Sequence, residues 1–315
     1  MDRIPDEAAA YVELERMRWA DQPTCCHCDS TNVRFLVPSN GISRTTSSGG
    51  ESVRRVWQCR DCRRQFSVTT GTVMHGSKVS LRIWLLVMFE LVSDKNGISA
   101  REVERKYGVC PRTAWHLLHR LRAAMANGGL LPTITGTVIV DETFVGGEIG
   151  NKHRSQIRDK RDTHHTMTAV FTLIDAATGE SRSRVVPDVT GATLGKVLAE
   201  HVNIGQSTLW SDSAKQYGPV GKQFVEHEAV NHMWGEYVRY EDGQVITTNQ
   251  AENFFSQLKR SIDGTHHHVS RKHLDRYLGE FDFRYSTKHV NDGQRMARLA
   301  GQLDGIRLTY KRVSS

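Results

Sequence analysis

The spacing of hydrophobic residues changes along the chain and separates a helical first part from a mixed second part. In residues 81–91 the apolar side chains recur every three or four positions, which predicts a helix with one buried face. Ser99 and Glu102 have the spacing of a capping box, so a second helix is expected to begin after Ser99 and to end near Gly108. A third helix is expected over residues 111–125.

From residue 136 onward, short runs rich in β-branched residues alternate with helical stretches. Strands are predicted at residues 136–141, 166–175, 183–189 and 207–210. Two helices are expected, one over residues 191–202 and one that begins near Asn249. The order of strand, strand, strand, helix, strand and helix predicts an α/β domain with a mixed sheet.

The second and third helices of the first part flank a turn at Gly108 and match the helix-turn-helix plan. In that plan the later helix lies in the major groove of DNA. Arg112, His116 and Arg120 lie on this helix and are therefore candidate DNA-binding residues. The alternative on pattern alone is a generic three-helix bundle with a solvated basic face.

The cysteines are concentrated near the start of the chain. Two C-x-x-C pairs supply four candidate zinc ligands: Cys25, Cys28, Cys59 and Cys62. Each two-residue gap allows a tight turn to aim two thiolates at one point, as a tetrahedral structural Zn²⁺ ion requires. Cys26 is expected to point away from the metal, and Cys110 is expected to be a buried small hydrophobic residue.

The composition is that of a globular protein. The chain has 315 residues, of which 38% are hydrophobic, and can bury a core in two or three domains. Charges interrupt every apolar run and the first residues are too acidic for an export signal, so a soluble cytoplasmic protein without a membrane segment is expected. Residues 1–130 carry 19 basic and 13 acidic side chains, whereas residues 131–315 carry 23 and 22. This asymmetry indicates that the N-terminal part of the chain binds a polyanion.

Acidic residues stand where two of the expected strands end. Asp141 ends the first strand, and Asp212 follows the fourth. If these strand ends meet at one edge of the sheet, the two carboxylates can hold hard cations, which prefer carboxylate oxygen. On the helix that follows, Glu252 and Lys259 lie about 20° apart around the axis, and Asn249 lies about 60° from Glu252. One side of this helix can therefore present all three residues to the site.

Five short segments add a more specific pattern. They read FSVTTGT at 66–72, VDETFVGG at 140–147, VPDVTGA at 186–192, SD at 211–212 and TNQAENFF at 248–255. In this order they resemble bacterial insertion-sequence transposases of the ISXO type. That family carries a zinc ribbon, a helix-turn-helix and a ribonuclease-H-like catalytic domain of the DDE class. The resemblance extends over residues 23–288 and includes segments near 264–274 and 280–285.

The resemblance implies a multidomain fold, in which a small zinc ribbon and a helix-turn-helix precede an α/β ribonuclease-H-like domain with a mixed sheet. The expected boundaries are an N-terminal segment at 1–22, the zinc ribbon at 23–70, the helix-turn-helix at 78–127, the catalytic domain at 133–288 and a C-terminal tail at 289–315. A helix is expected in the tail around residues 296–303.

The resemblance also implies an activity. Asp141 and Asp212 would hold two Mg²⁺ or Mn²⁺ ions for strand cleavage at terminal inverted repeats and for strand transfer into target DNA. The third ligand is Asn in some branches of the family and Glu in others, and this chain has both Asn249 and Glu252. Three acids neutralise two metal ions better than two acids, and Lys259 has the family's spacing from Glu252, so Glu252 is favoured while both stay candidates.

DNA contacts and partners follow from the same resemblance. Lys259 is expected to touch DNA phosphate near the cut. Further candidates for contacts to the DNA backbone are His266, His267, His268, Arg271 and Lys272. Because transposition joins two element ends, a homodimer or larger assembly on double-stranded DNA is implied, in the cytoplasm and associated with the nucleoid.

Two other hypotheses about the function of the chain stay open. Three consecutive histidines followed by Tyr277 or Tyr285 loosely resemble metal-dependent nucleases that cut DNA with a tyrosine nucleophile. The chain can alternatively be a DNA-binding regulator whose catalytic domain has decayed. Inverted repeats beside the gene would favour the transposase over the regulator.

Overall fold

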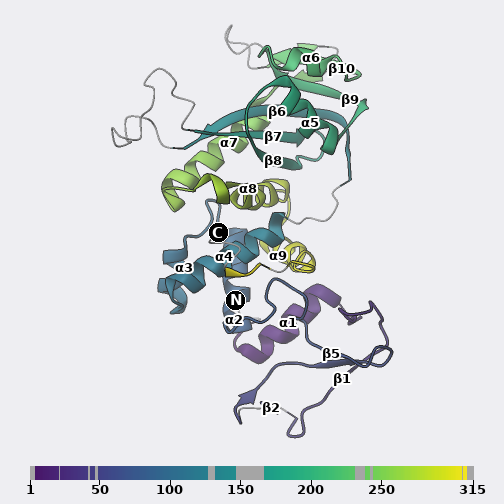
Figure 1. The fold of residues 1–315 in the computed structure, drawn as a ribbon, viewed down its shortest axis with the longest axis vertical. Coiled ribbons are helices and arrows are strands. Elements are labelled where there is room, and N and C mark those ends of the chain that lie inside the picture. Colours follow the sequence, from purple (N-terminus) through teal and green to yellow (C-terminus); the bar gives the residue numbers. More distant parts are fainter. Residues whose placement is uncertain are drawn as a thin grey trace. The chain divides into compact units, whose positions relative to one another are not determined.

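The computed structural model of the protein describes residues 4–20, 22–41, 43–46, 49–126, 132–146, 167–230, 238–241, 244–306 and 308–310. The chain divides into two compact units (Figure 1). The first unit comprises residues 1–127 and 290–315, and the second comprises residues 128–289. Within the described ranges, no helix is long and apolar enough to cross a membrane.

The first unit begins with a helix that the sequence patterns did not predict, α1 (Glu7–Trp19). The side chain of Asp6 caps it by accepting a hydrogen bond from the Ala9 N–H at 2.8 Å. A small antiparallel sheet follows, in the order β1 (Val33–Phe35), β4 (Trp57–Cys59) and β5 (Gln65–Phe66). Between β1 and β4 the chain forms a separate pair of short strands, β2 (Arg44–Thr45) and β3 (Glu51–Ser52).

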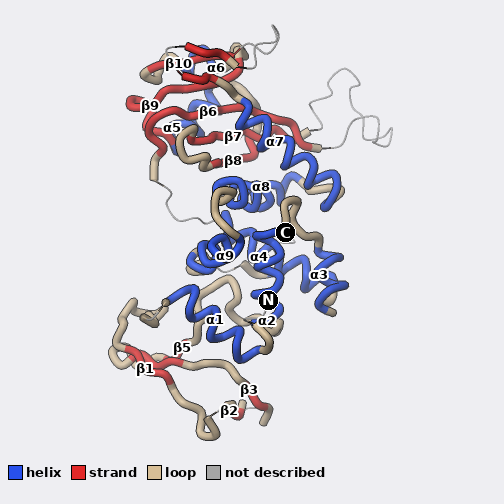
Figure 2. The backbone as a smooth tube through the Cα atoms, turned by 180° about the vertical axis from the view of Figure 1, so that it is seen from behind, coloured by secondary structure: helices blue, strands red, loops and turns tan. Residues whose placement is uncertain are grey.

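Three helices continue this unit and confirm the predicted helices: α2 (Leu81–Ser93), α3 (Ala100–Tyr107) and α4 (Pro111–Ala126). Ser99 caps α3 as expected, because its hydroxyl accepts a hydrogen bond from the Glu102 N–H at 3.2 Å. Gly108 ends α3 with a φ of 65°, a left-handed conformation that glycine adopts without strain. In Figure 2 the helices of this unit are blue and the strands of the small sheet are red.

The end of the chain returns to this first unit. The expected C-terminal helix is present as α9 (Asp292–Gly301), which packs against α1 and α2. Residues beyond α9 then pair with the segment that follows the small sheet: the Val73 N–H donates to the Leu303 carbonyl at 2.9 Å, and the Gly305 N–H donates to the Gly71 carbonyl at 3.1 Å. The first unit is therefore assembled from both ends of the chain.

The second unit is built on a mixed five-stranded sheet in the order β10-β9-β6-β7-β8. Its strands are β6 (Ile134–Val145), β7 (Thr168–Asp175), β8 (Ser181–Val186), β9 (Val202–Asp212) and β10 (Glu226–Val230). Strand β7 runs antiparallel to its two neighbours, β6 and β8, whereas β9 is parallel to both β6 and β10. This mixed sheet is the one expected and is consistent with a ribonuclease-H-like fold.

Helices cover both faces of this sheet (Figure 1). One face packs against α7 (Asn249–Ser261) and α8 (Arg271–Ser286), through a core cluster that includes Ile139, Trp210 and Phe254. The other face packs against α5 (Gly191–His201) and α6 (Tyr217–Gly221), through a cluster that includes Val138 and Leu209. Alternate residues of β6 thus enter different cores, which is why Val138, Ile139 and Val140 at its centre are all apolar.

Strand β6 is longer than predicted. The expected strand ended at Asp141, but β6 continues to Val145 because residues 142–145 pair with residues 168–171 of β7. This pairing needs a partner strand about 30 residues away in the sequence, so no local signal marks it. Asp141 consequently lies within a strand rather than at its end, and only Asp212 ends its strand as predicted.

Three short elements of the second unit lie outside the five-stranded sheet. They are the short antiparallel pair β11 (Arg239–Glu241) and β12 (Gln244–Ile246), and a π-helical turn η5 (Ile262–His266) that directly extends α7.

Candidate active site and zinc site

The four cysteines of the two C-x-x-C pairs converge in the first unit. Their sulfur atoms all lie within 4.8 Å of one another, with 3.7 Å between the Sγ atoms of Cys25 and Cys62 and 3.6 Å between those of Cys28 and Cys59. A tetrahedral zinc ion with Zn–S bonds of about 2.3 Å separates its sulfur ligands by about 3.8 Å. The cluster therefore has the dimensions of a Cys₄ zinc site.

Hydrogen bonds hold the two C-x-x-C turns in place. The backbone N–H of His27 lies 3.4 Å from the Cys25 sulfur, and that of Cys62 lies 3.5 Å from the Cys59 sulfur. Hydrogen bonds from the backbone N–H groups of Cys62 and Asp61 lower the pKa of Cys59 to about 7, whereas burial and the neighbouring cysteines raise the pKa of Cys28; a bound Zn²⁺ ion would favour the thiolate form of both. Asp61 also links the turns, because its carboxylate accepts hydrogen bonds from Ser30 at 2.5 Å and from Asn32 at 2.8 Å.

The remaining two cysteines lie outside this cluster. Cys26 is exposed and is not among the converging sulfurs, as predicted. The prediction for Cys110 was wrong: its side chain is exposed, and its sulfur lies 3.0 Å from the Thr113 hydroxyl. Cys110 directly precedes α4, and a residue at this position faces the open first turn of the helix rather than the core.

In the second unit, Asp141 and Asp212 lie on neighbouring strands and on the same face of the sheet. Ile139 of β6 is paired with Trp210 of β9, and the two aspartates come two residues after this pair in each strand. Because side chains alternate along a strand, both aspartates share the face of Ile139 and Trp210. That face is the one packed against α7 and α8.

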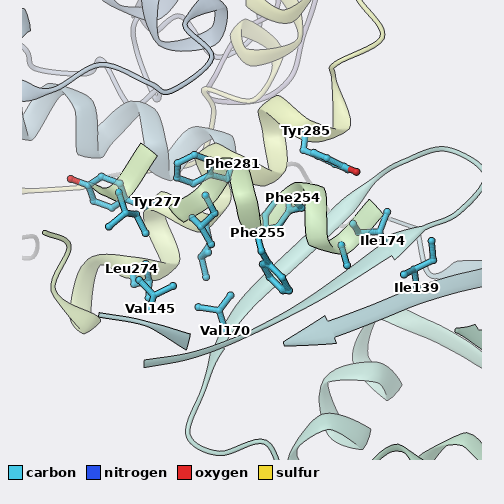
Figure 3. Packing of buried hydrophobic residues seen from close by; sticks show 14 of the residues in the cluster. Ile139, Val145, Val170, Ile174, Phe254, Phe255, Leu274, Tyr277, Phe281 and Tyr285 are labelled. Atoms are coloured by element: carbon cyan, nitrogen blue, oxygen red, sulfur yellow. The ribbon is translucent and has the colours of Figure 1, made fainter. Parts of the chain in front are cut away.

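Helix α7 packs on this face through Ala251, Phe254, Phe255 and Leu258, which are all buried. Figure 3 shows Phe254 and Phe255 close to Val170 and Ile174 of β7. At about 100° per residue, Glu252 and Lys259 lie about 110° and about 90° from the centre of this buried stripe. Asn249 lies about 170° from it, nearly on the opposite side. Glu252 and Lys259 therefore lie on the flank of the buried stripe, whereas Asn249 lies on the far side of the helix; all three are exposed.

The electrostatics of Asp141 connect the three acids. Burial raises the pKa of Asp141 to about 7, and the charges of Glu142, Asp212 and Glu252 contribute to the rise. The opposing influence is the Glu142 backbone N–H, which donates to Asp141 Oδ1 at 2.8 Å. A divalent cation fits such a site, because its charge offsets the repulsion among the carboxylates and favours their ionised forms. Among the described residues, however, the four cysteines are the only group of three or more Cys, His, Asp or Glu side chains whose ligand atoms all lie within 4.8 Å of one another.

The next residue, Glu142, lies on the opposite face of the sheet and has hydrogen-bond partners there. Its carboxylate accepts hydrogen bonds from the Gln216 amide at 2.5 Å and from the hydroxyl of Tyr217, both near α6. These bonds tie α6 to β6 directly behind Asp141. The sequence reasoning did not assign this role, although the adjacent pair of acids at 141–142 was a visible signal.

A second group that the sequence reasoning missed lies at the end of β9. Ser211 is fully buried, and its hydroxyl donates to the Asp212 carbonyl at 2.7 Å and lies 2.8 Å from His227 Nε2 on β10. The hydroxyl has one proton, so His227 Nε2 must donate to it. The pairing of β9 with β10, which brings these residues together, is not visible in the sequence.

Two parts of the chain match known protein families. Residues 133–286 match the family described as ISXO2-like transposase domain, and residues 5–65 match the transposase zinc-ribbon domain. Residues 133–286 are an ISXO2-like transposase domain. It is also 25% identical, over 291 residues, to an uncharacterized protein in transposable element ISH50 of Halobacterium salinarum, with 89% of this chain and 91% of that protein covered.

One solved structure that the chain resembles is a simian T-cell lymphotropic virus intasome in complex with PP2A regulatory subunit B56 gamma. The sequence identity is 12% and the TM-score is 0.29, with 62% of this chain and 65% of that chain covered. At this TM-score the superposition supports no conclusion about fold or activity.

The candidate DNA-binding residues of α4 have different environments in the structure. Arg112 is exposed and His116 is half-buried. Arg120 is buried, stacks on the ring of Trp84 at 5.1 Å and donates to the His75 carbonyl at 2.8 Å. The structure thus separates Arg112, which is accessible, from Arg120, which belongs to the packing of the first unit.

The candidates after α7 are accessible. Four of them are exposed: His267, His268, Arg271 and Lys272. His266 instead packs edge-on against Tyr277, with 4.9 Å between the ring centroids. Tyr277 and Tyr285 are both buried in the core between the transposase domain's sheet and helices, and the Tyr285 hydroxyl donates to the Gln250 carbonyl at 3.0 Å. These environments give the tyrosine-nucleophile reading no support.

Proposed function

We propose that the chain is the transposase of an insertion sequence, which binds the terminal inverted repeats of the element and catalyses metal-dependent strand cleavage and strand transfer. The observation that carries the proposal is the placement of Asp141 and Asp212 on one face of a mixed sheet, beside a helix that bears Glu252. The match of residues 133–286 to the ISXO2-like transposase domain supports the same reaction.

Asp141, Asp212 and Glu252 are the residues that would hold Mg²⁺ or Mn²⁺. When bound, two such ions would activate a water or a 3′-hydroxyl and stabilise the charge that develops on the phosphate. The pKa of Asp141 supports this role, because a carboxyl with a pKa of about 7 exchanges its proton for a cation near neutral pH. Glu252 is favoured over Asn249 as the third ligand, since α7 turns Asn249 away from the sheet.

Other residues of the chain would bind and orient DNA. Lys259 lies on the same side of α7 as Glu252, two helical turns away, and is exposed. Its ammonium group would contact a phosphate next to the one that reacts. The exposed residues that follow α7 would extend this contact along the DNA backbone: His267, His268, Arg271 and Lys272.

The first unit would recognise the element ends. Helices α3 and α4, joined at Gly108, would act as a helix-turn-helix, with Arg112 and His116 toward the major groove. The Cys₄ cluster would hold one structural Zn²⁺. Two chains would act together on the two ends of the element, as a homodimer or a larger assembly in the cytoplasm.

Cleavage of a labelled duplex taken from the flanks of the gene tests this proposal. Wild-type protein is expected to nick the duplex in Mg²⁺ and not in EDTA. Asp141→Asn, Asp212→Asn and Glu252→Gln are expected to lose cleavage, and Asn249→Ala is expected to retain it. Glu200→Gln is the matched control, because Glu200 is an exposed acid on α5, on the other side of the sheet.

Two results would contradict the proposal in different ways. Loss of cleavage in Asn249→Ala but not in Glu252→Gln would make Asn249 the third ligand. Tight binding of the duplex by wild-type protein, without cleavage in Mg²⁺ or Mn²⁺, would support the decayed DNA-binding regulator instead.

A further inference from the structure

Residues 308–310 lie against α4, the helix that the proposed function places in the major groove. His116 Nε2 lies 3.2 Å from the Leu308 carbonyl oxygen. A carbonyl oxygen only accepts, so Nε2 carries the proton and donates it. The ring of Tyr310 packs edge-on against two residues of α4, with 6.0 Å to the Trp115 ring and 5.7 Å to the His116 ring. Residues 308–310 and the first turns of α4 therefore form one surface.

Arg112 is held on this surface by Tyr310. Its guanidinium carbon lies 5.3 Å from the centroid of the Tyr310 ring, within the range of a cation–π contact. A long arginine side chain on an exposed helix otherwise samples many rotamers, and ordering it on binding weakens the complex. Stacking on an aromatic face restricts the guanidinium and leaves its N–H edge available for hydrogen bonds to phosphate or to guanine.

The charge of the C-terminal segment indicates what binds here. Residues 306–315 read IRLTYKRVSS and contain three basic and no acidic residues. A segment that blocked a basic helix would be expected to carry acidic residues, because their negative charge would imitate that of DNA. Arg112 is exposed on this surface, and the sequence that flanks residues 308–310 adds only positive charge, which is complementary to a polyanion.

We propose that residues 308–310 and the N-terminal half of α4 form a composite DNA-binding surface, in which Tyr310 positions Arg112 for contact with the element end. The inference rests on the proposed function of α4 in DNA binding. It adds that the C-terminal segment, which the sequence separates from α4 by the whole transposase domain, takes part in recognising DNA.

Fluorescence anisotropy with a labelled duplex from the gene's flanks tests the inference, with an unrelated duplex of the same length as competitor. Tyr310→Ala is expected to weaken binding by about two- to fivefold, the effect of an exposed cation–π contact. Tyr310→Phe keeps the ring and is expected to bind like wild type. Thr309→Ala is the matched control, because Thr309 is exposed and adjacent but makes none of these ring contacts.

A double-mutant cycle separates positioning from a general structural role. The Arg112→Ala, Tyr310→Ala double variant is expected to bind no more weakly than Arg112→Ala alone, because Tyr310 acts through Arg112. Arg112→Ala is also expected to lower the slope of log K against log salt by about 0.9, the value for one lost phosphate contact. All variants should bind zinc and melt at the wild-type temperature.

Three outcomes would overturn the inference. Tighter binding by Tyr310→Ala would show that the segment covers α4 and opposes DNA binding. Additive losses in the double variant, or a loss in Tyr310→Phe as large as in Tyr310→Ala, would show that the ring does not act through Arg112. If wild-type protein fails to bind the duplex at all, the proposed DNA-binding function fails together with the inference.

Discussion

The raised pKa of Asp141 makes metal binding by the transposase domain depend on pH in a calculable way. A cation must displace the proton of this carboxyl, whose pKa is about 7. About nine-tenths of the carboxyl groups are ionised at pH 8 and about one-tenth at pH 6, so the apparent affinity for Mg²⁺ is expected to fall about tenfold between these values.

Without metal, the same pKa has a stability consequence of defined sign. The folded-state pKa of Asp141 lies above the ordinary value of 3.8, so the folded form keeps its proton when the unfolded form has lost it. The stability associated with this proton is fully present below about pH 4 and is lost as the pH rises through 7. Bound Mg²⁺ should offset the loss, so the metal should stabilise the fold more at pH 8 than at pH 6.

Isothermal titration calorimetry of wild-type protein with Mg²⁺ measures both quantities. Titrations at pH 7 in two buffers of different ionisation enthalpy should show release of about half a proton per binding event. Asp141→Asn has no proton to release, and any residual binding should not vary between pH 6 and pH 8. Equal wild-type affinity at pH 6 and pH 8 without proton release would refute the reasoning, because it would place the pKa of Asp141 well below 6.

The other predictions concern the zinc site, the α7 core and the two arginines of α4. Cys59→Ser should lower the zinc content measured by atomic absorption and weaken DNA binding, whereas Cys26→Ser should retain one zinc per chain. Phe254→Ala removes a ring that is 2% exposed and packs against Tyr285, so the free energy of unfolding measured by urea denaturation should fall by about 3–5 kcal/mol. Arg120→Ala should lower the melting temperature because Arg120 is buried, whereas Arg112→Ala should leave it unchanged and weaken DNA binding. Equal melting temperatures for the two arginine variants would contradict this division.

Features with a short sequence period could be read without the structure. The helices α2, α4 and α7 and the strand β7 were expected close to where they lie, because each carries a run of apolar residues with the spacing of its own type of secondary structure. The zinc ligands were equally visible, because a two-residue gap between cysteines is a local geometric constraint. The placement of Glu252 and Lys259 on one side of α7 followed from helix geometry alone.

Features that depend on distant partners required the tertiary structure. The extension of β6 past Asp141 arises from its pairing with β7, and the burial of Arg120 arises from its packing on Trp84 of α2. The basic residues of α4 looked equivalent in the sequence, since a periodic pattern does not state which face another element covers.

The return of the C-terminal segment is the clearest case. Residues 303–305 and 308–310 contact segments near residues 71–73 and 112–116, about 200 or more positions earlier in the chain. The sequence by itself determined the main helices and the spacing of the four cysteines, because short-range geometry specifies them, and it named Asp141, Asp212 and Glu252 as candidate acids through the family resemblance. Only the tertiary structure decided which strands pair, which faces are buried and that both ends of the chain build one unit, because these depend on contacts between residues far apart in the sequence.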